Sequence, residues 1–207
     1  MADLNKIYLY RMTHIENVPH IFQYGITHVM SVNANKSYKT IGDENIIGTR
    51  NQIFLPNGKN LGDYIPFYFG VRMPMLYVIQ KGYNGVPVTQ AEDIVYGISS
   101  VQKIVDHKLN FIFSDGHAVD GLTNFHEQKE LSNIDRILDK NAIDATYWHN
   151  DKDLDLKRRK EAEFLVENDV PTTAIIAWVV YNEKAKQKLL SMGISEEKIY
   201  VKTNCYF

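Results

Sequence analysis

The residues with the clearest chemical potential form a short basic and acidic segment late in the chain. Four consecutive basic residues come first: Lys157, Arg158, Arg159 and Lys160. Glu161 and Glu163 follow at once, and then an apolar stretch over residues 164–166. Cationic side chains can bind a polyanion, and a fixed carboxylate can stabilise positive charge that develops on a sugar. The segment therefore indicates chemistry on a nucleic acid or nucleotide, although a solvated helix face leading into the core has the same appearance.

A second segment places three potentially catalytic side chains close together. Ser114, Asp115 and His117 supply a hydroxyl, a carboxylate and an imidazole around Gly116. The members of a working catalytic triad usually come from separate elements. An Asp-Gly turn after a strand, with a structural histidine, is therefore the simpler interpretation. The same reasoning applies to His14, which taken alone is more often structural than catalytic.

Two further residues have chemistry that depends on their neighbours. Arg50 ends a short apolar stretch inside a long polar segment, and a single arginine of this kind is usually a surface charge. Tyr68 lies between Phe67 and Phe69 in an expected strand. Because side chains alternate along a strand, Tyr68 faces away from both phenylalanines and its ring can form the floor of a cleft. The alternative is an ordinary tyrosine of a sheet.

The bulk composition restricts the classes of function. With 207 residues, of which 44% are hydrophobic and 23% charged, residues 1–207 are expected to form one domain with its own core. The one cysteine, Cys205, cannot form an internal disulfide, so a reducing, cytoplasmic location is expected. The histidines are dispersed, and no metal site is expected. A net charge of −2 requires a local patch for any nucleic acid. No apolar stretch is long enough to span a membrane.

Strand and helix patterns mix irregularly along the chain. Strands are expected over residues 7–12, 66–70, 94–98, 110–113, 174–181 and 198–203. Helices are expected over residues 17–25, 45–51, 100–106 and 183–192, with an amphipathic helix and a charged loop over 130–155. Residues 75–79 fit either state, and the polar segment 31–62 indicates a long functional loop. This mixture favours the α+β class over a doubly wound sheet.

Taken together, these segments resemble ADP-ribosyltransferases of the His-Tyr-Glu type and, more narrowly, the DarT family of DNA ADP-ribosyltransferase toxins from DarT–DarG toxin–antitoxin pairs. The fragments that carry the resemblance occur in the family's order: THIENVP (13–19), IIGTR (46–50), DYIPFYF (63–69), MPMLY (73–77), FSDGHA (113–118) and RRKEAEFLV (158–166). The resemblance implies a split mixed β-sheet with flanking helices and long loops that bind NAD and DNA.

The resemblance also implies roles for individual residues. Glu163 would be the essential carboxylate that stabilises the ribosyl cation, and Arg50 the second catalytic residue, which activates the base. NAD would be bound by six residues: Thr13, His14, Asn17, Tyr68, Met75 and Tyr77. Beside the resemblance, the residue types predict contacts with the DNA strand: the four basic residues with phosphates, Tyr147 and Trp148 with bases through stacking, and Asp115 and His117 in orienting the target base.

The implied reaction transfers ADP-ribose from NAD to a base of single-stranded DNA, with thymine favoured and guanine second. A DarG-like macrodomain antitoxin is the partner that the resemblance implies, and a monomer is expected. Glu161 departs from the family, where a neutral or basic residue is expected two positions before the catalytic glutamate. The pair Glu161 and Glu163 also matches the Glu-x-Glu pattern of arginine-modifying ADP-ribosyltransferases. Modification of protein arginine, a non-catalytic single-strand binder and plain NAD hydrolysis therefore remain as alternatives.

Overall fold

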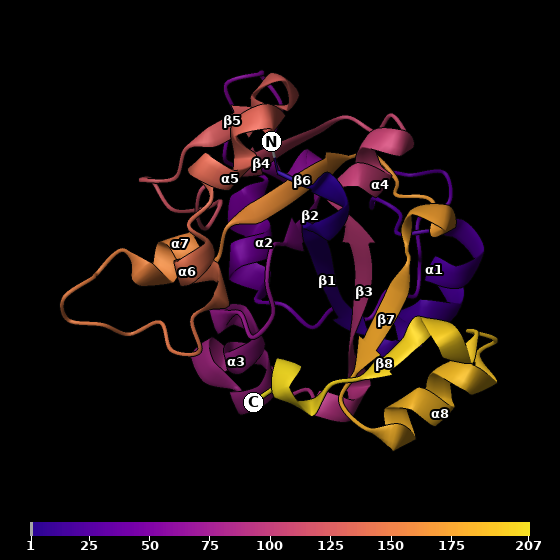
Figure 1. The fold of residues 1–207 in the computed structure, drawn as a ribbon. Helices are drawn as coiled ribbons and strands as arrows, with labels where there is room; N and C mark the ends of the chain where they lie inside the picture. The colour runs from indigo at the N-terminus through magenta and orange to yellow at the C-terminus, as the bar shows by residue number, and fades with distance from the viewer. Residues whose placement is uncertain (1) are drawn as a thin grey trace.

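An eight-stranded sheet runs through the centre of the computed structural model, which describes residues 2–207 (Figure 1). The strands are β1 (Tyr8–His14), β2 (Tyr64–Tyr68), β3 (Ile94–Ser100), β4 (Phe111–Ser114), β5 (Phe125–Glu127), β6 (Glu163–Glu167), β7 (Ala177–Val180) and β8 (Ile199–Val201). Their order is β5-β4-β6-β2-β1-β3-β7-β8, and β7 pairs with β8 in parallel while the other neighbours are antiparallel. The expected α+β class with a mixed sheet is confirmed.

The sheet is split between β1 and β2. These strands share the register pair Tyr10 and Tyr68, whereas β1 and β3 are in register from Tyr8 to His14. Strands that are paired over so short a length diverge beyond the contact, and side chains at their free ends can line a cleft. Glu163 lies one strand away from this split, because it is the register partner of Tyr68 on the other side of β2.

Short helices cover the sheet and connect its strands (Figure 1). They are α1 (Val18–Tyr24), α2 (Glu44–Arg50), α3 (Pro74–Lys81), α4 (Val101–Asp106), α5 (Ile134–Ile137), α6 (Lys140–Asp144), α7 (Leu156–Lys160) and α8 (Glu183–Ser191). Residues 75–79, which fit either state, are helical in α3, because Pro74 starts the helix and Gly82 ends it in the left-handed region at φ 72.

Helix α1 ends at Gly25, whose φ of 83 lies in the region that favours glycine. A side chain at this position would overlap the carbonyl oxygen of Val170. The close approach lets Ile26 pair with Val170, with N–O distances of 2.9 and 2.8 Å. The start of the loop after α1 is therefore attached to the connection between β6 and β7.

Two expected elements differ from the structure. The strand predicted over residues 174–181 is confined to β7, and the residues before it form a short 3-10 turn at Thr172–Ala174. Pro171 lies before this turn, and the buried hydroxyl of Ser99 donates to the carbonyl of Ala174 at 2.7 Å. Residues 130–155 contain the two short helices α5 and α6 in place of one amphipathic helix. The contact of Ser99 with Ala174 comes from a distant strand, so the hydrophobic pattern of residues 174–181 could not indicate where β7 begins.

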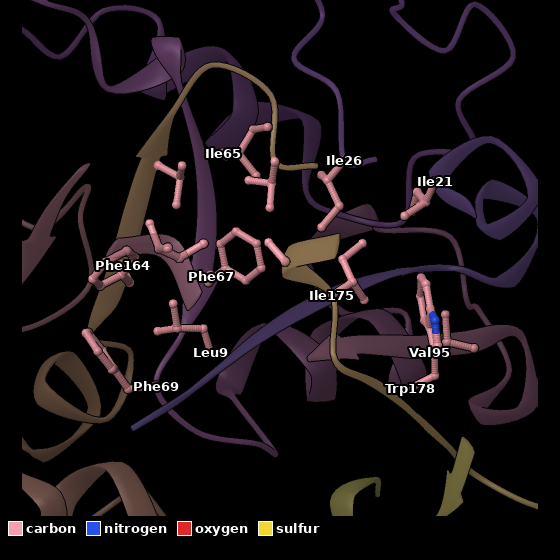
Figure 2. Packing of buried hydrophobic residues seen from close by; sticks show 14 of the residues in the cluster. Leu9, Ile21, Ile26, Ile65, Phe67, Phe69, Val95, Phe164, Ile175 and Trp178 are labelled. Atoms are coloured by element: carbon pink, nitrogen blue, oxygen red, sulfur yellow. The ribbon is translucent and has the colours of Figure 1, made fainter. Parts of the chain in front are cut away.

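Apolar side chains cover the two faces of the sheet. Figure 2 shows one cluster, in which the ring of Phe67 lies among other buried residues such as Leu9 and Phe164. Tyr10 and Tyr68 belong to the cluster on the other face, as the alternation along a strand requires. Burying one such large side chain stabilises the fold by about 1.5–3 kcal/mol. The core thus fixes β1, β2 and β6, which carry the candidate site.

Candidate active site

Glu163 and Tyr68 are neighbours across two antiparallel strands. Glu163 begins β6, Tyr68 ends β2, and the two are register partners. Residues directly opposite each other in an antiparallel pair project to the same face of the sheet. Burial, followed by the nearby Glu163 carboxylate, raises the pKa of Tyr68 well above its ordinary value, so the phenol stays neutral. A carboxylate and a neutral aromatic ring therefore share one side of the split sheet.

The carboxylate of Glu163 is buried and held by two donors. Its Oε2 accepts a hydrogen bond from Nη1 of Arg50 at 2.8 Å, and its Oε1 accepts one from the backbone N of Ala118 at 3.0 Å. The side chains of Arg50 and Glu163 are 11% and 1% exposed. A charge-assisted pair in a site of low dielectric is strong and well oriented. Glu163 therefore does not point into solvent, and its oxygen atoms have fixed positions.

The segment 114–118 forms the support beneath Glu163. The hydroxyl of Ser114 accepts from the backbone N of Glu163 at 3.1 Å and donates to the carbonyl of Gly116 at 2.7 Å. Asp115 accepts from Nη1 of Arg158 at 2.8 Å, and a side chain at Gly116 would overlap that guanidinium. The serine and aspartate of this motif thus position the carboxylate. The sequence predicted this turn but not its hydrogen bonds to Glu163.

A cavity of about 520 Å³ opens beside Glu163. Five of the predicted site residues line it: Thr13, Arg50, Tyr68, Met75 and Glu163. This volume lies within the range of sites for cofactors and small ligands, about 300–1,000 Å³. The structure therefore gathers residues from β1, α2, β2, α3 and β6 around one space.

Three residues predicted to bind NAD lie outside the lining of this cavity: His14, Asn17 and Tyr77. The Nδ1 atom of His14 accepts from the backbone N of Glu16 at 3.1 Å. Burial, reinforced by Lys39, lowers the pKa of His14 below its usual range, so the ring is neutral. Its tautomer then places the hydrogen on Nε2, which keeps a donor for a ligand. His14 thus has a donor on Nε2 and follows Thr13, which lines the cavity; its contact with NAD stays a prediction.

The amide of Asn17 is fully engaged by the protein. It donates to Thr13 Oγ1 and to the carbonyl of Lys39, both at 2.9 Å, and accepts from Lys39 N at 2.8 Å. Asn17 is 1% exposed. The structure thus departs from the expectation that Asn17 contacts NAD, because its amide instead braces the loop beside the cavity.

Tyr77 belongs to an aromatic cluster on the outside of α3. Its ring centroid lies 5.5 Å from that of Tyr83, 5.7 Å from Trp148 and 5.1 Å from Phe207. The C-terminus accordingly lies beside α3 (Figure 1). The structure places Tyr77 and Trp148 in a packing role that their types alone did not reveal. Tyr147, by contrast, is 80% exposed.

The basic run is largely neutralised by the protein itself. Arg158 pairs with Asp155 and Asp115, and Arg159 pairs with Asp139, Asp153 and Asp155. These carboxylates occupy the guanidinium donors that phosphates would need. Among the four basic residues expected to contact phosphates, Lys157 is the exposed one.

Lys160 is buried, with 1% exposure, and cannot reach a phosphate. Its Nζ donates to the carbonyls of Ile143 and Ala145 at 3.0 and 2.7 Å. Burial, only partly opposed by Asp144, lowers the pKa of Lys160 to about 8. The expectation that Lys160 tracks DNA is therefore corrected: it attaches the end of α6 to α7.

Glu161 does not share the arrangement of Glu163. It caps the end of α7 with φ −90 and ψ 26, so residues 161–163 are not extended throughout. Glu161 is 3% exposed, and this burial raises its pKa. Two carboxylates on one extended face, which the arginine-modifying alternative needs, are not formed.

Several residues that line the cavity could not be predicted from the sequence pattern. Tyr38, Ile41 and Asp43 line the cavity from the polar loop, where no periodicity marks the residues that face inward. Arg11 also lines it and donates to the carbonyl of Pro66 at 3.1 Å. Its position two residues before Thr13 in β1 is the pattern that could have identified it.

Two findings concern other classes of site. Among residues 2–207, His, Cys, Asp and Glu side chains form no group of three that could hold a metal ion. No helix in the same range combines the length and apolar character needed to cross a membrane.

Known proteins are similar in sequence to this chain over most of its length. A family profile described as "ssDNA thymidine ADP-ribosyltransferase, DarT" matches residues 10–207. A DNA ADP-ribosyl transferase of Thermus sp. (strain 2.9) is 34% identical over 189 residues, which are 89% of this chain and 86% of that protein. A DNA ADP-ribosyl transferase-DNA ADP-ribosyl glycohydrolase fusion protein of Thermosipho africanus is 28% identical over 182 residues, which are 87% of this chain and 44% of that protein.

Solved structures share the fold. Thermus sp. 2.9 DarT in complex with ADP-ribosylated ssDNA has a TM-score of 0.82 at 29% identity, covering 97% of this chain and 96% of that chain. The same protein in complex with NAD+ has a TM-score of 0.79 at 28% identity, covering 100% and 99%. The fold and the site thus define an NAD-dependent ADP-ribosyltransferase. The chain belongs to the DarT family of DNA ADP-ribosyltransferases, as the order of its motifs predicted.

Proposed function

We propose that this chain transfers ADP-ribose from NAD to thymine in single-stranded DNA, with Glu163 and Arg50 as its catalytic residues. The buried ion pair of these two side chains, 2.8 Å apart beside the cavity, carries the proposal. The family profile names thymidine as the acceptor, and relatives have been seen with NAD+ and with ADP-ribosylated single-stranded DNA.

Glu163 acts on the donor. The C1′–N bond of NAD breaks with its electron pair leaving on nicotinamide, and positive charge spreads over C1′ and the ring oxygen, as in glycoside cleavage. An ionised Glu163 that accepts a hydrogen bond from the ribose 2′-hydroxyl stabilises this charge without a covalent bond. A fixed contact of this kind lowers the barrier by about 3 kcal/mol or more. The donors from Arg50 and Ala118 keep the carboxylate in place until the sugar arrives.

Arg50 acts on the acceptor. Its Nη2 atom is buried and has no hydrogen-bond partner within residues 2–207. Buried donors are normally paired, so this one is suited to a ligand oxygen. Arginine is always charged and does not serve as a base. Bound to a carbonyl oxygen of thymine, Arg50 stabilises the anion that forms as a ring nitrogen loses its proton to solvent and bonds to C1′.

NAD lies in the cavity with Tyr68 against the nicotinamide ring and Met75 beside it. Thr13 and His14 bind the adenosine-side ribose from the end of β1, where Nε2 of His14 is the donor. Tyr77 supports the wall of the site from α3, and Asn17 supports it from the start of α1. Each residue predicted to bind NAD thus has a role at the site, and Tyr77 and Asn17 act indirectly.

The DNA strand approaches past the loop that precedes Glu163. A base in a duplex cannot reach a buried carboxylate, so a single strand is the suitable substrate. Exposed Tyr147 and Lys157 supply a stacking ring and a phosphate contact, and His117 orients the base. Arg158, Arg159 and Asp115 hold this loop and the segment 114–118 in shape through their ion pairs.

A macrodomain glycohydrolase that removes the modification is the partner that we infer, because a relative carries both activities in one fusion protein. We further infer that the chain is the toxin of a toxin–antitoxin pair and that it acts as a monomer in the cytoplasm.

Mass spectrometry of short single-stranded oligonucleotides incubated with the protein and NAD tests the proposal. The expected result is a gain of one ADP-ribose on thymine-containing oligonucleotides and none on matched oligonucleotides without thymine. Transfer to guanine would change the acceptor, and nicotinamide release without any adduct would reduce the activity to NAD hydrolysis.

A further inference from the structure

A loop without helix or strand forms much of the cavity wall. The cavity loop, residues 27–43, joins the end of α1 to the start of α2. Lining residues lie at both of its ends, among them His28 and Val29 near its start and Tyr38 and Asp43 near its end. Backbone ladders do not hold such a segment, so side chains from elsewhere must fix its shape.

Asp169 fixes the first part of the cavity loop. It lies in the connection between β6 and β7, and its Oδ1 accepts from the backbone N of His28 at 2.7 Å. Its Oδ2 accepts from the hydroxyl of Ser31 at 2.5 Å. Both bonds are charge-assisted, which makes them short and strong. Asp169 is absent from the cavity lining, so any effect it has on a ligand passes through the loop.

Further hydrogen bonds attach the cavity loop to the rest of the protein. Nδ1 of the His28 ring accepts from the backbone N of Met30 at 3.2 Å, so Nε2 carries the hydrogen and donates to the carbonyl of Gly62 at 2.9 Å. Asn17 binds the backbone of Lys39 through both N and O. The loop is thus fixed from three separate segments of the chain.

We propose that Asp169 is a positioning residue for the NAD site, which holds the cavity loop in its binding conformation before NAD arrives. This inference rests on the proposed function, because the ligand of the cavity is NAD. When only a fraction of molecules has the competent loop, the apparent affinity falls by that fraction. The chemical step then proceeds normally in the molecules that have bound NAD. Loss of the Asp169 tether therefore raises the KM for NAD and leaves kcat nearly unchanged.

Steady-state kinetics with a saturating thymine-containing oligonucleotide measures this effect. Asp169→Ala is expected to raise the KM for NAD on the order of tenfold with kcat within about twofold of wild type. Asp169→Asn is expected to stay close to wild type, because its Oδ1 can accept from His28 N and its Nδ2 can donate to Ser31 Oγ. Asp3→Ala is the matched control, since Asp3 also accepts a backbone hydrogen bond, from Asn5 at 3.1 Å, but caps a turn outside the site.

Combining Asp169→Ala with Ser31→Ala tests the coupling directly. Ser31 supplies one of the two hydrogen bonds that Asp169 accepts, and its hydroxyl also accepts from the backbone N of Asn33 at 3.0 Å. The double variant is therefore expected to raise the KM by less than the product of the two single increases. A KM for NAD that is unchanged in both Asp169→Ala and the double variant would overturn the proposal, as would a loss confined to kcat.

Hydrogen exchange of the cavity loop without NAD separates this inference from the proposed function. Amides of residues 27–39 are expected to exchange faster in Asp169→Ala than in wild type, while Asp169→Asn and Asp3→Ala remain close to wild type. If wild type transfers nothing to DNA, the proposed function fails, but the exchange result still decides the role of Asp169. Unchanged exchange in Asp169→Ala rejects the tether whatever the activity shows.

Discussion

Arg50 at the end of α2 and Glu163 at the start of β6 form an ion pair across 113 residues of sequence, with Nη1 and Oε2 separated by 2.8 Å. The pair brings Arg50, which we propose acts on the thymine, into contact with Glu163, which we propose acts on NAD. It also leaves Nη2 of Arg50 buried and available to a ligand. In the proposed reaction, the side chain that acts on NAD and the side chain that acts on thymine therefore form one hydrogen-bonded unit, in which each keeps the other oriented.

Glu163→Gln is expected to lower transfer to DNA by about 10²–10³-fold or more, because only the carboxylate strengthens its interaction as the ribosyl cation forms. Glutamine can still accept the hydrogen bond from Ala118, so the local backbone is retained. The measurements are ADP-ribose incorporation into an oligonucleotide and release of nicotinamide, and both are expected to fall together. Thermal unfolding of the variant serves as the control, since breaking a buried pair can cost about 3–5 kcal/mol.

Arg50→Ala separates the two halves of the reaction. Transfer to DNA is expected to be lost while some NAD hydrolysis is retained, because Glu163 still stabilises the ribosyl cation and water replaces the base. Arg50→Lys is the matched variant: it keeps the positive charge near Glu163 but loses the planar set of donors. It is expected to resemble Arg50→Ala in transfer and to retain more hydrolysis. Equal residual hydrolysis in Arg50→Ala and Glu163→Ala would remove the proposed division of roles.

Much of the proposed catalytic pair and its surroundings could be predicted from the sequence. The alternation of Phe67, Tyr68 and Phe69 predicts which ring faces the cavity, and the order of short motifs identifies Glu163 and Arg50. The sequence does not show which carboxylate neutralises which cation. Arg158 meets Asp115 from 43 positions away, and only the packing of α7 against the segment 114–118 decides that contact.

The same reason explains the corrected assignments. A run of four basic residues predicts a surface for phosphates, but the ammonium group of Lys160 points inward to two carbonyls at the end of α6. Asn17 is of a type that can bind NAD, yet its amide is already hydrogen-bonded to Thr13 and Lys39. Side-chain orientation at the end of a short helix or turn is set by tertiary contacts, which local sequence patterns do not encode.

Ser114→Ala tests the support beneath Glu163. The substitution removes the acceptor for the backbone N of Glu163, and both groups are buried. An unsatisfied buried donor costs about 1–3 kcal/mol, so the free energy of unfolding is expected to fall by that amount. The turnover number is expected to fall as well, because the carboxylate loses precision in its position. Ser191→Ala removes the hydrogen bond from an exposed hydroxyl at the end of α8 to the carbonyl of Lys188 and is expected to leave turnover unchanged.

Lys160 gives the protein a distinct dependence of stability on pH. Its pKa is lowered from 10.5 to about 8 in the folded state, chiefly by burial. Between these two values the unfolded chain binds a proton that the folded chain does not, so the free energy of unfolding rises with pH. Below about pH 8 the unfavourable burial of the charge is fully present. Denaturation of wild type and Lys160→Met at several pH values is expected to show wild type gaining stability, relative to the variant, from about pH 8 upward.

The salt dependence of DNA binding distinguishes Lys157 from Lys160, although the two lie three positions apart in one basic run. Each phosphate contact on a single strand contributes about 0.7 to the slope of log K against log salt concentration. Lys157 is exposed, so Lys157→Ala is expected to weaken binding of a thymine oligonucleotide and to lower the slope by about that amount. Lys160→Met is expected to leave the slope unchanged even if the loop shifts, because its ammonium group is already bound to Ile143 and Ala145. Fluorescence anisotropy over a series of salt concentrations measures both variants, and an equal drop in slope would return Lys160 to the DNA-binding surface.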